Sequence, residues 1–240
     1  MELGGFVVFD IETFANLPTC ISFCFDGFES VCIPLLDFTV PLDQRMLMLR
    51  LVLKLLESPI PKVNQNIKFD WRKLYRFGFS VSNVSGDTML AASCLYAEFP
   101  KNLGFLTSIY TDMPYFKDES GKDFDPTRHN RDRVYLYNAK DSLATHIIHT
   151  QQLAELTESG TAPVYKNLIT ILPIYKEMED NGLLVDDYQR RKLLAAYESL
   201  YDIHCTKLCR LVGRSINPLS SVVCQKLVYD ELGFKKIRGI

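Results

Sequence analysis

The sequence predicts an α/β fold in which helices flank a mixed sheet, followed by an all-helical segment. Three observations support this prediction. Residues 6–13 form a short apolar, β-branched run typical of a buried strand. Two more β-rich runs follow, and a further strand returns after a helix, which indicates a β-α-β crossover. After residues 159–163, a stretch of small residues, the pattern contains helices only, so we expect domains at 1–158 and 159–240.

Composition indicates an ordinary globular chain. Its 240 residues carry a net charge of −2, which argues against wrapping long duplex DNA but not against gripping a short strand end. No apolar run approaches the ~20 residues of a membrane span, and no export leader is evident, so we expect a cytoplasmic, non-secreted protein. The seven cysteines form no C-x-x-C pairs, which favours reduced thiols over a zinc site.

The first half of the chain reads as strands followed by a crossover. Runs at 19–25 and 28–33 flank Asp26-Gly27, a strong hairpin signal, so three antiparallel strands are expected. Residues 42–58 form a helix that is apolar on nearly every side, which predicts that it is largely buried. Prolines at 59 and 61 end it, and residues 60–64 return to the sheet.

Helices dominate from there onward. We expect helices at 67–77, which Gly78 ends, at 88–96 and at 103–110, then a long surface loop over 111–130 and a helix over 130–158. The last segment predicts helices at 164–181, bent at Pro173, at 187–212 and at 220–232.

Two carboxylates mark the end of the first strand. Asp10 and Glu12 are two residues apart, so both side chains project from one face of the sheet. Like charges held this close call for a cation. A solvated strand end is the alternative for an isolated D-x-E pair, so the pair needs further support.

Further acidic and basic residues could join this pair. Asp70 lies in the first turns of its helix, and Tyr137 and Asp141 share a helix face one turn apart. His146 and His149 follow on that helix, and we expect them at its surface. Basic residues gather in two groups that could grip a strand or be solvated helix faces: Lys62, Lys68, Arg72, Lys73 and Arg76, and Arg128, His129, Arg131 and Arg133.

Together these motifs resemble the three exonuclease motifs of DEDD-type 3′-5′ exonucleases, in the tyrosine-bearing subclass. The matching stretches, in the family's order, are Phe9-Asp10-Ile11-Glu12-Thr13, Asn64-Gln65-Asn66-Ile67-Lys68-Phe69-Asp70 and Tyr137-Asn138-Ala139-Lys140-Asp141. Residues 87–90, 103–111 and 178–186 make the chain similar to the proofreading part of family A DNA polymerases, especially the phage and viral kind. The resemblance implies an RNase H-like exonuclease domain over 1–158, with 159–240 as the start of a polymerase thumb.

The resemblance also implies a chemistry, the release of 5′-mononucleotides from single-stranded DNA 3′ ends. Two divalent ions, Mg²⁺ or Mn²⁺, suit this reaction because they activate water and stabilise the leaving oxyanion, and hard cations prefer oxygen ligands. By carry-over from the family, Asp10 bridges the ions and Asp70 holds one of them. Glu12 and Asp141 complete the site of the water-activating ion, and Tyr137 orients the water. The candidate substrate contacts are Thr13, Gln65, Asn66, Phe69 and Lys101.

Several alternatives stay open. The chain lacks the palm and fingers of such a polymerase, so we expect no polymerase activity from it alone. Its expected partner is a polymerase domain, in the same full-length chain or as a separate subunit. An RNA 3′-exonuclease would use the same carboxylates, and a metal-dead binding module would have lost one of them. A purely structural sheet domain would leave four motif-matched acids unexplained.

Overall fold

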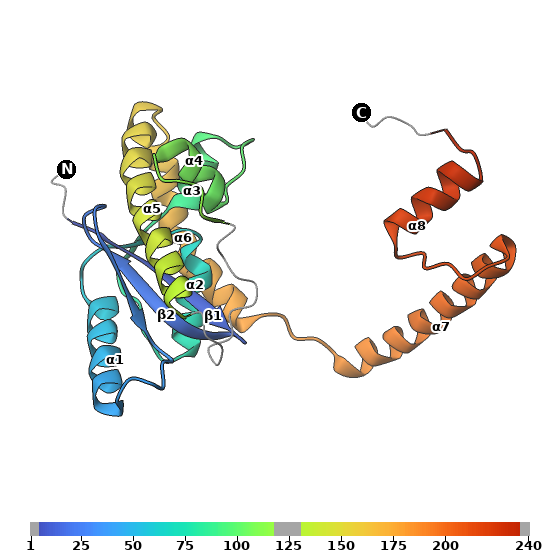
Figure 1. Cartoon of the computed structure of the whole chain (residues 1–240), viewed down its shortest axis with the longest axis horizontal. Helices are drawn as coiled ribbons and strands as arrows, with labels where there is room; N and C mark the ends of the chain where they lie inside the picture. The colour runs from blue at the N-terminus through green and yellow to red at the C-terminus, as the bar shows by residue number, and fades with distance from the viewer. Residues whose placement is uncertain (1–4, 118–130, 236–240) are drawn as a thin grey trace. The chain divides into compact units, whose positions relative to one another are not determined.

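The computed structural model describes residues 5–117 and 131–235, which form two compact units that divide between Asn181 and Gly182. Figure 1 shows the elements of both. We expected the division after residue 158. It falls later because α6 (Ala162–Asn181) packs against elements of the first unit, namely α2, α3, α5 and β5.

A five-stranded mixed sheet organises the first unit. Its order is β3-β2-β1-β4-β5, and its strands are β1 (Val7–Phe14), β2 (Leu17–Cys24), β3 (Ser30–Pro34), β4 (Lys62–Asn64) and β5 (Val84–Asp87). The first three strands pair antiparallel, and β4 pairs parallel with β1 and β5. The expected hairpin and crossover are therefore confirmed. The sequence analysis missed β5, which runs directly into a helix.

Helices cover both faces of this sheet. They are α1 (Leu42–Glu57), α2 (Ile67–Arg76) and α5 (Arg131–Glu158), and two further helices, α3 (Thr88–Leu95) and α4 (Leu103–Tyr110), pack against α5. Strand β1 alternates between the two faces. Val7, Phe9 and Ile11 enter the main core with α1 and α2, whereas Val8 faces the side on which Leu143 of α5 packs. Figure 1 shows α5 running alongside β1 and β2.

Helix α1 is less buried than its composition predicts. Only Val52 and Leu56 are buried, while Leu42, Leu47 and Leu51 are each more than half exposed. The expectation of a largely buried helix is therefore wrong. A helix that is apolar on nearly every side can still contact the sheet along one stripe only, because a single neighbour covers a single face.

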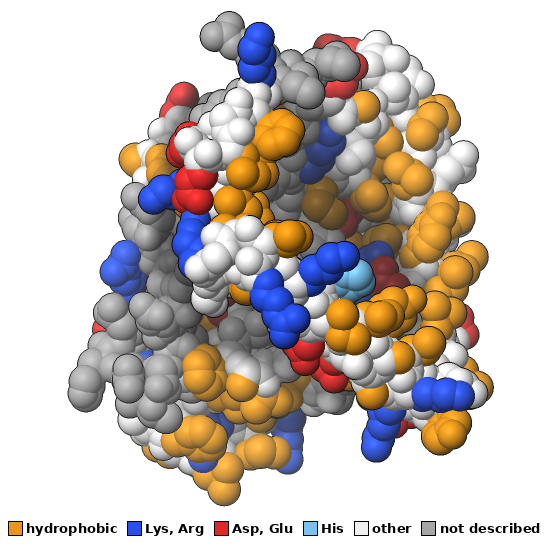
Figure 2. All heavy atoms as spheres, turned by 90° about the vertical axis from the view of Figure 1, so that its right-hand side faces the viewer, with side chains coloured by type: hydrophobic (Ala, Val, Ile, Leu, Met, Phe, Trp, Pro, Cys, Tyr) orange, Lys and Arg blue, Asp and Glu red, His pale blue; other side chains and the backbone are white. Residues whose placement is uncertain are grey.

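The second unit is helical, as expected. It contains α7 (Asp187–Val212), α8 (Ser221–Gln225) and a π-helical turn, η2 (Lys226–Glu231), in place of the single helix expected over 220–232. Asp186 caps α7 by accepting a hydrogen bond from the Gln189 backbone N–H at 3.0 Å. Helix α7 buries no residue, and apolar side chains are visible on the surface drawn in Figure 2. None of the helices in the described part of the chain has both the length and the apolar character of a membrane span.

Candidate active site

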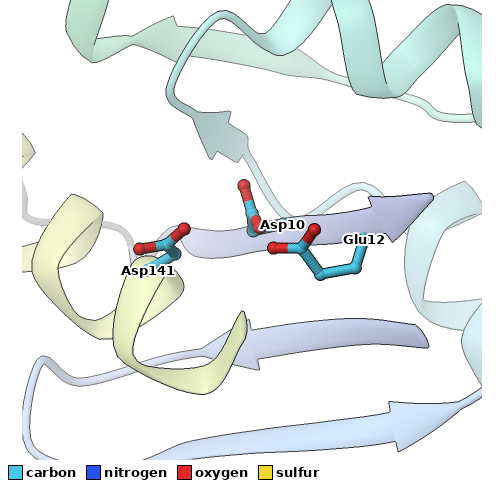
Figure 3. Close-up of side chains that lie close together, drawn as sticks. All are labelled: Asp10, Glu12 and Asp141. Atoms are coloured by element: carbon cyan, nitrogen blue, oxygen red, sulfur yellow. The ribbon is translucent and has the colours of Figure 1, made fainter. Parts of the chain in front are cut away.

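Three carboxylates meet between β1 and α5. One carboxylate oxygen from each of Asp10, Glu12 and Asp141 lies within 4.8 Å of the others. Figure 3 shows the two strand residues and the helix residue pointing toward one another. Asp10 and Glu12 share the sheet face that α5 covers, because side chains two apart on a strand project from one side. The sequence spacing thus placed these two side chains correctly.

Hydrogen bonds fix the position of Asp10 relative to α5. The Asn138 side chain Nδ2 donates to Asp10 Oδ2 at 2.7 Å, and the Ser22 hydroxyl of β2 donates to the Asn138 backbone carbonyl at 2.9 Å. Asn138 is fully buried. Asn138 therefore ties Asp10, Asp141's helix and the neighbouring strand together.

Asp70 approaches the cluster from α2. Its Oδ1 accepts a hydrogen bond from the Ile11 backbone N–H at 3.1 Å, between the two strand carboxylates in sequence. Helix α2 begins there because Asn66 adopts a left-handed conformation (φ 57°) and the Asp87 carboxylate accepts the N–H groups of Asn66 and Ile67. Asp70 is buried next to Asp10 but is not one of the three carboxylates that lie within 4.8 Å of one another.

The cluster is electrostatically strained. Burial, and then the charges of Asp70, Asp141 and Glu12, raise the pKa of Asp10 well above its ordinary value. Burial and Asp141 raise the pKa of Glu12 to about 7. A site that disfavours its own negative charges binds cations well, since a bound cation removes the repulsion.

Tyr137 and a lysine complete the site. Tyr137 is buried one turn before Asp141, and its hydroxyl accepts a hydrogen bond from Lys117 Nζ at 2.8 Å. The same ammonium forms an ion pair with Asp141 Oδ1. Sequence reasoning missed Lys117 because it placed residues 111–130 in a surface loop. The apolar Phe116 before it was the available signal, since that ring is buried against Tyr137. Residues 118–130 lie outside the described part of the chain.

Of the candidate substrate residues, Thr13 lies on β1, and the others lie in or just before α2 and α4. Phe69 is half exposed, and Lys73 Nζ lies 5.3 Å from the centre of its ring. Gln65 instead braces the fold, because its Nε2 donates to the Lys101 carbonyl at 2.6 Å and its Oε1 accepts from Thr88. Lys101 Nζ donates to the carbonyls of Ala97 and Phe99. Thr13 and Asn66 are partly buried. The substrate roles of these residues stay predictions.

Several basic residues take structural roles. Lys62 is fully buried and donates to carbonyls at the end of α1, so it is not part of a strand-gripping surface. Lys68 and Arg72 form ion pairs with Glu179, and Arg72 also pairs with Asp180 of α6. In the second group, Arg131 pairs with Asp37 and Arg133 is exposed, while Arg128 and His129 lie outside the described residues.

The expectation for the two histidines of α5 is wrong. His146 and His149 are both buried, not at the helix surface. His146 stacks on Phe6 with ring centres 4.4 Å apart, and Phe6 meets His149 edge-on at 5.0 Å. Both lie on the α5 side that packs on the sheet, where the lack of a side chain at Gly86 makes room for the His149 ring.

The donor set fits hard divalent cations. Three carboxylate oxygens within 4.8 Å of one another, with a fourth carboxylate beside them, are the ligands that Mg²⁺ and Mn²⁺ prefer. No histidine or cysteine belongs to this group of described residues, which disfavours zinc.

Comparison with known proteins shows the family of this chain. The family model for the 3′-5′ exonuclease of the DNA polymerase A type matches residues 10–157. DNA polymerase I from Synechocystis sp. is 29% identical over 191 residues, covering 73% of this chain. The chain covers only 18% of that relative's length.

Solved structures show the same fold. The POL domain of Pol1 from M. smegmatis, in complex with DNA primer-template and dNTP, gives a TM-score of 0.62 at 17% identity, covering 99% of this chain and 39% of that one. Brucella melitensis NrnC with bound Mg²⁺ gives 0.57 at 19% identity, covering 73% and 85%. The first unit thus has the expected RNase H-like exonuclease fold. The chain belongs to the 3′-5′ exonuclease family of the DNA polymerase A type.

Proposed function

We propose that this chain is a metal-dependent 3′-5′ exonuclease that hydrolyses the 3′ ends of single-stranded DNA to 5′-mononucleotides. The observation that carries the proposal is the three-carboxylate group of Asp10, Glu12 and Asp141, with Asp70 beside it, in a chain of an exonuclease family. The four residues come from three separate elements. Acids needed only for solubility would be exposed, whereas Asp70 and Asp141 are buried and Asp10 and Glu12 are partly buried beside them.

The four carboxylates would hold two divalent ions, Mg²⁺ or Mn²⁺. When bound, such ions activate water and stabilise the leaving oxyanion. The chain's own residues supply position. Asn138 orients Asp10, the Ile11 N–H orients Asp70, and Tyr137 directs its hydroxyl to the space beside Asp141. Tyr137 acts as a hydrogen-bonding group, because burial raises its pKa further above neutrality.

We further propose that the enzyme proofreads for a family A DNA polymerase of the phage or viral type. The helical segment 159–240 would then be the start of the thumb. The similarity to a Pol1 structure over 99% of this chain supports the assignment. The polymerase domain, in the same full-length chain or as a separate subunit, would be the partner, and the cytoplasm, where DNA is replicated in a bacterial cell, would be the place of action.

A gel assay with 5′-labelled single-stranded DNA tests the activity. Wild type is compared with Asp141→Ala and Tyr137→Phe, with Mg²⁺, with Mn²⁺ or with excess chelator. The matched control is Asp132→Ala, which removes an exposed acid from the same helix. We expect a metal-dependent ladder shortening from the 3′ end. Asp141→Ala should abolish it, Tyr137→Phe should weaken it, and the control should leave it intact.

Two outcomes would change the proposal. If the enzyme shortens a matched RNA but not DNA, the proposed substrate becomes RNA and the proposed hydrolysis is unchanged. No shortening of either, with or without a polymerase portion joined to the chain, would leave a module that binds strand ends as the better explanation.

A further inference from the structure

Lys117 contacts two side chains of the proposed catalytic site. Its Nζ lies 2.8 Å from the Tyr137 hydroxyl oxygen and 2.5 Å from Asp141 Oδ1. The ammonium also lies 4.7 Å from the centre of the Tyr137 ring. One positive charge therefore links the hydroxyl and the carboxylate that α5 presents one turn apart.

The surroundings of Lys117 form a built site rather than a chance surface contact. The preceding Phe116 is 2% exposed and packs edge-on against Tyr137, with ring centres 5.8 Å apart. The lysine stem passes over Gly104 of α4, where an added Cβ would lie 3.1 Å from Lys117 Cγ. The lysine side chain itself is only 18% exposed. Ordering and burying a long cationic side chain costs free energy, which the contacts with Tyr137 and Asp141 offset.

The hydrogen-bonding capacity of a phenol makes this contact specific. A tyrosine hydroxyl has one hydrogen to donate and lone pairs to accept. Lys117 has no acceptor, so it must donate to the Tyr137 oxygen, and the hydroxyl hydrogen must point away from the ammonium. The lysine thereby selects the direction in which Tyr137 can donate, and its ion pair holds Asp141 in place beside that hydroxyl.

We propose that Lys117 is a positioning residue of the exonuclease reaction, which fixes the Tyr137 hydroxyl relative to Asp141. This inference rests on the proposed function. Lys117 transfers no proton and forms no covalent bond. Its effect is on the reaction step and not on substrate affinity, because it acts through two groups at the proposed point of water attack.

Steady-state kinetics of Lys117→Met on single-stranded DNA tests the role. We expect kcat to fall by about 30-fold while KM changes by less than about twofold. Lys117→Arg restores part of the loss, because it keeps a donor and a charge. The control, Lys54→Met, removes one exposed charge from α1, which packs on the other face of the sheet, and should retain kcat within about twofold. Urea unfolding, followed by the fluorescence of the single tryptophan, Trp71, shows that each variant is folded.

A double-mutant cycle with Tyr137→Phe separates positioning from general support. If Lys117 acts through the tyrosine hydroxyl, Lys117→Met should lower kcat by less than about fivefold in the Tyr137→Phe background. Independent effects that multiply would overturn the inference, as would a folded Lys117→Met enzyme with the kcat of Lys54→Met. Failure of the proposed function gives a different result, since wild type itself would then shorten no DNA.

Discussion

Burial of His149 makes the stability of the first unit sensitive to acid. The ring is 4% exposed, and its Nδ1 has no hydrogen-bond partner among the described residues. The ring lies between Phe6 and Gly86, and His146 is nearby. The negative charge of Asp26 favours the protonated form of His146. Burial, and then the charge of His146, lower the pKa of His149 to about 4, whereas an unfolded histidine has a pKa of about 6.5.

The sign and size of the effect follow from these two values. Between pH 6.5 and 4 the unfolded chain binds a proton that the folded His149 does not, so stability falls as the pH falls through this window. The full cost is about 3 kcal/mol, and about 1.4 kcal/mol is already lost at pH 5.5. Asp10, Asp70 and Glu12 act in the opposite direction, because their raised pKa values favour the folded state in acid.

A comparison of variants isolates the histidine from the carboxylates. His149→Gln keeps a polar side chain but cannot titrate, so wild type should lose about 1.4 kcal/mol more than this variant between pH 7.5 and 5.5. Urea titrations followed by Trp71 fluorescence measure the free energy of unfolding, since Trp71 packs against the core of the first unit. His204→Gln, at an exposed position of α7, is the control. Parallel pH profiles for wild type and His149→Gln would refute the reasoning.

Three further predictions concern buried polar groups and the domain limit. Lys62→Met should destabilise the first unit by about 3 kcal/mol in urea titrations, because it leaves the carbonyls at the end of α1 without their donor. Asp87→Ala should cost at least about 3 kcal/mol by the same measurement, since this carboxylate accepts four backbone N–H groups. A chain ending at residue 181 should keep a cooperative thermal transition and exonuclease activity, whereas one ending at residue 158 should melt at a lower temperature. Equal melting temperatures for the two shortened chains would contradict the placement of α6.

Local pattern predicted the parts of the fold whose signal is short-range. The alternation along β1 placed Asp10 and Glu12 on one side, and the 3.6-residue period placed Tyr137 one turn before Asp141. Hairpin chemistry at Asp26-Gly27 predicted the pairing of β2 and β3. In each case the two groups lie within one element or one turn of each other, so their geometry follows from backbone regularity.

The residues whose surroundings the sequence did not predict contact elements that are distant in the sequence. His146 and His149 look like solvent-facing residues of a polar helix until the sheet and Phe6 are placed against them. Lys62 looks like a surface cation until the segment that follows α1 places the Ser58 and Ile60 carbonyls beside its ammonium. Lys117 lies in a polar segment, and only the packing of its neighbour Phe116 directs it inward. These contacts depend on tertiary packing, which overrides local pattern.

The electrostatics of the site and its construction lead to one conclusion. Burial raises the pKa values of Asp10, Glu12 and Asp70, so holding these acids together at neutral pH lowers the stability of the fold. Nevertheless the structure holds three of the four acids in place: the Asn138 amide donates to Asp10, the Ile11 N–H donates to Asp70, and the Lys117 ammonium pairs with Asp141. A fold selected for stability alone would lose one of these carboxylates, because its removal relieves the repulsion. Rigid support for mutually repelling acids is the arrangement expected where cations must bind in a defined geometry, and hydrolysis of a phosphodiester is a reaction that needs it.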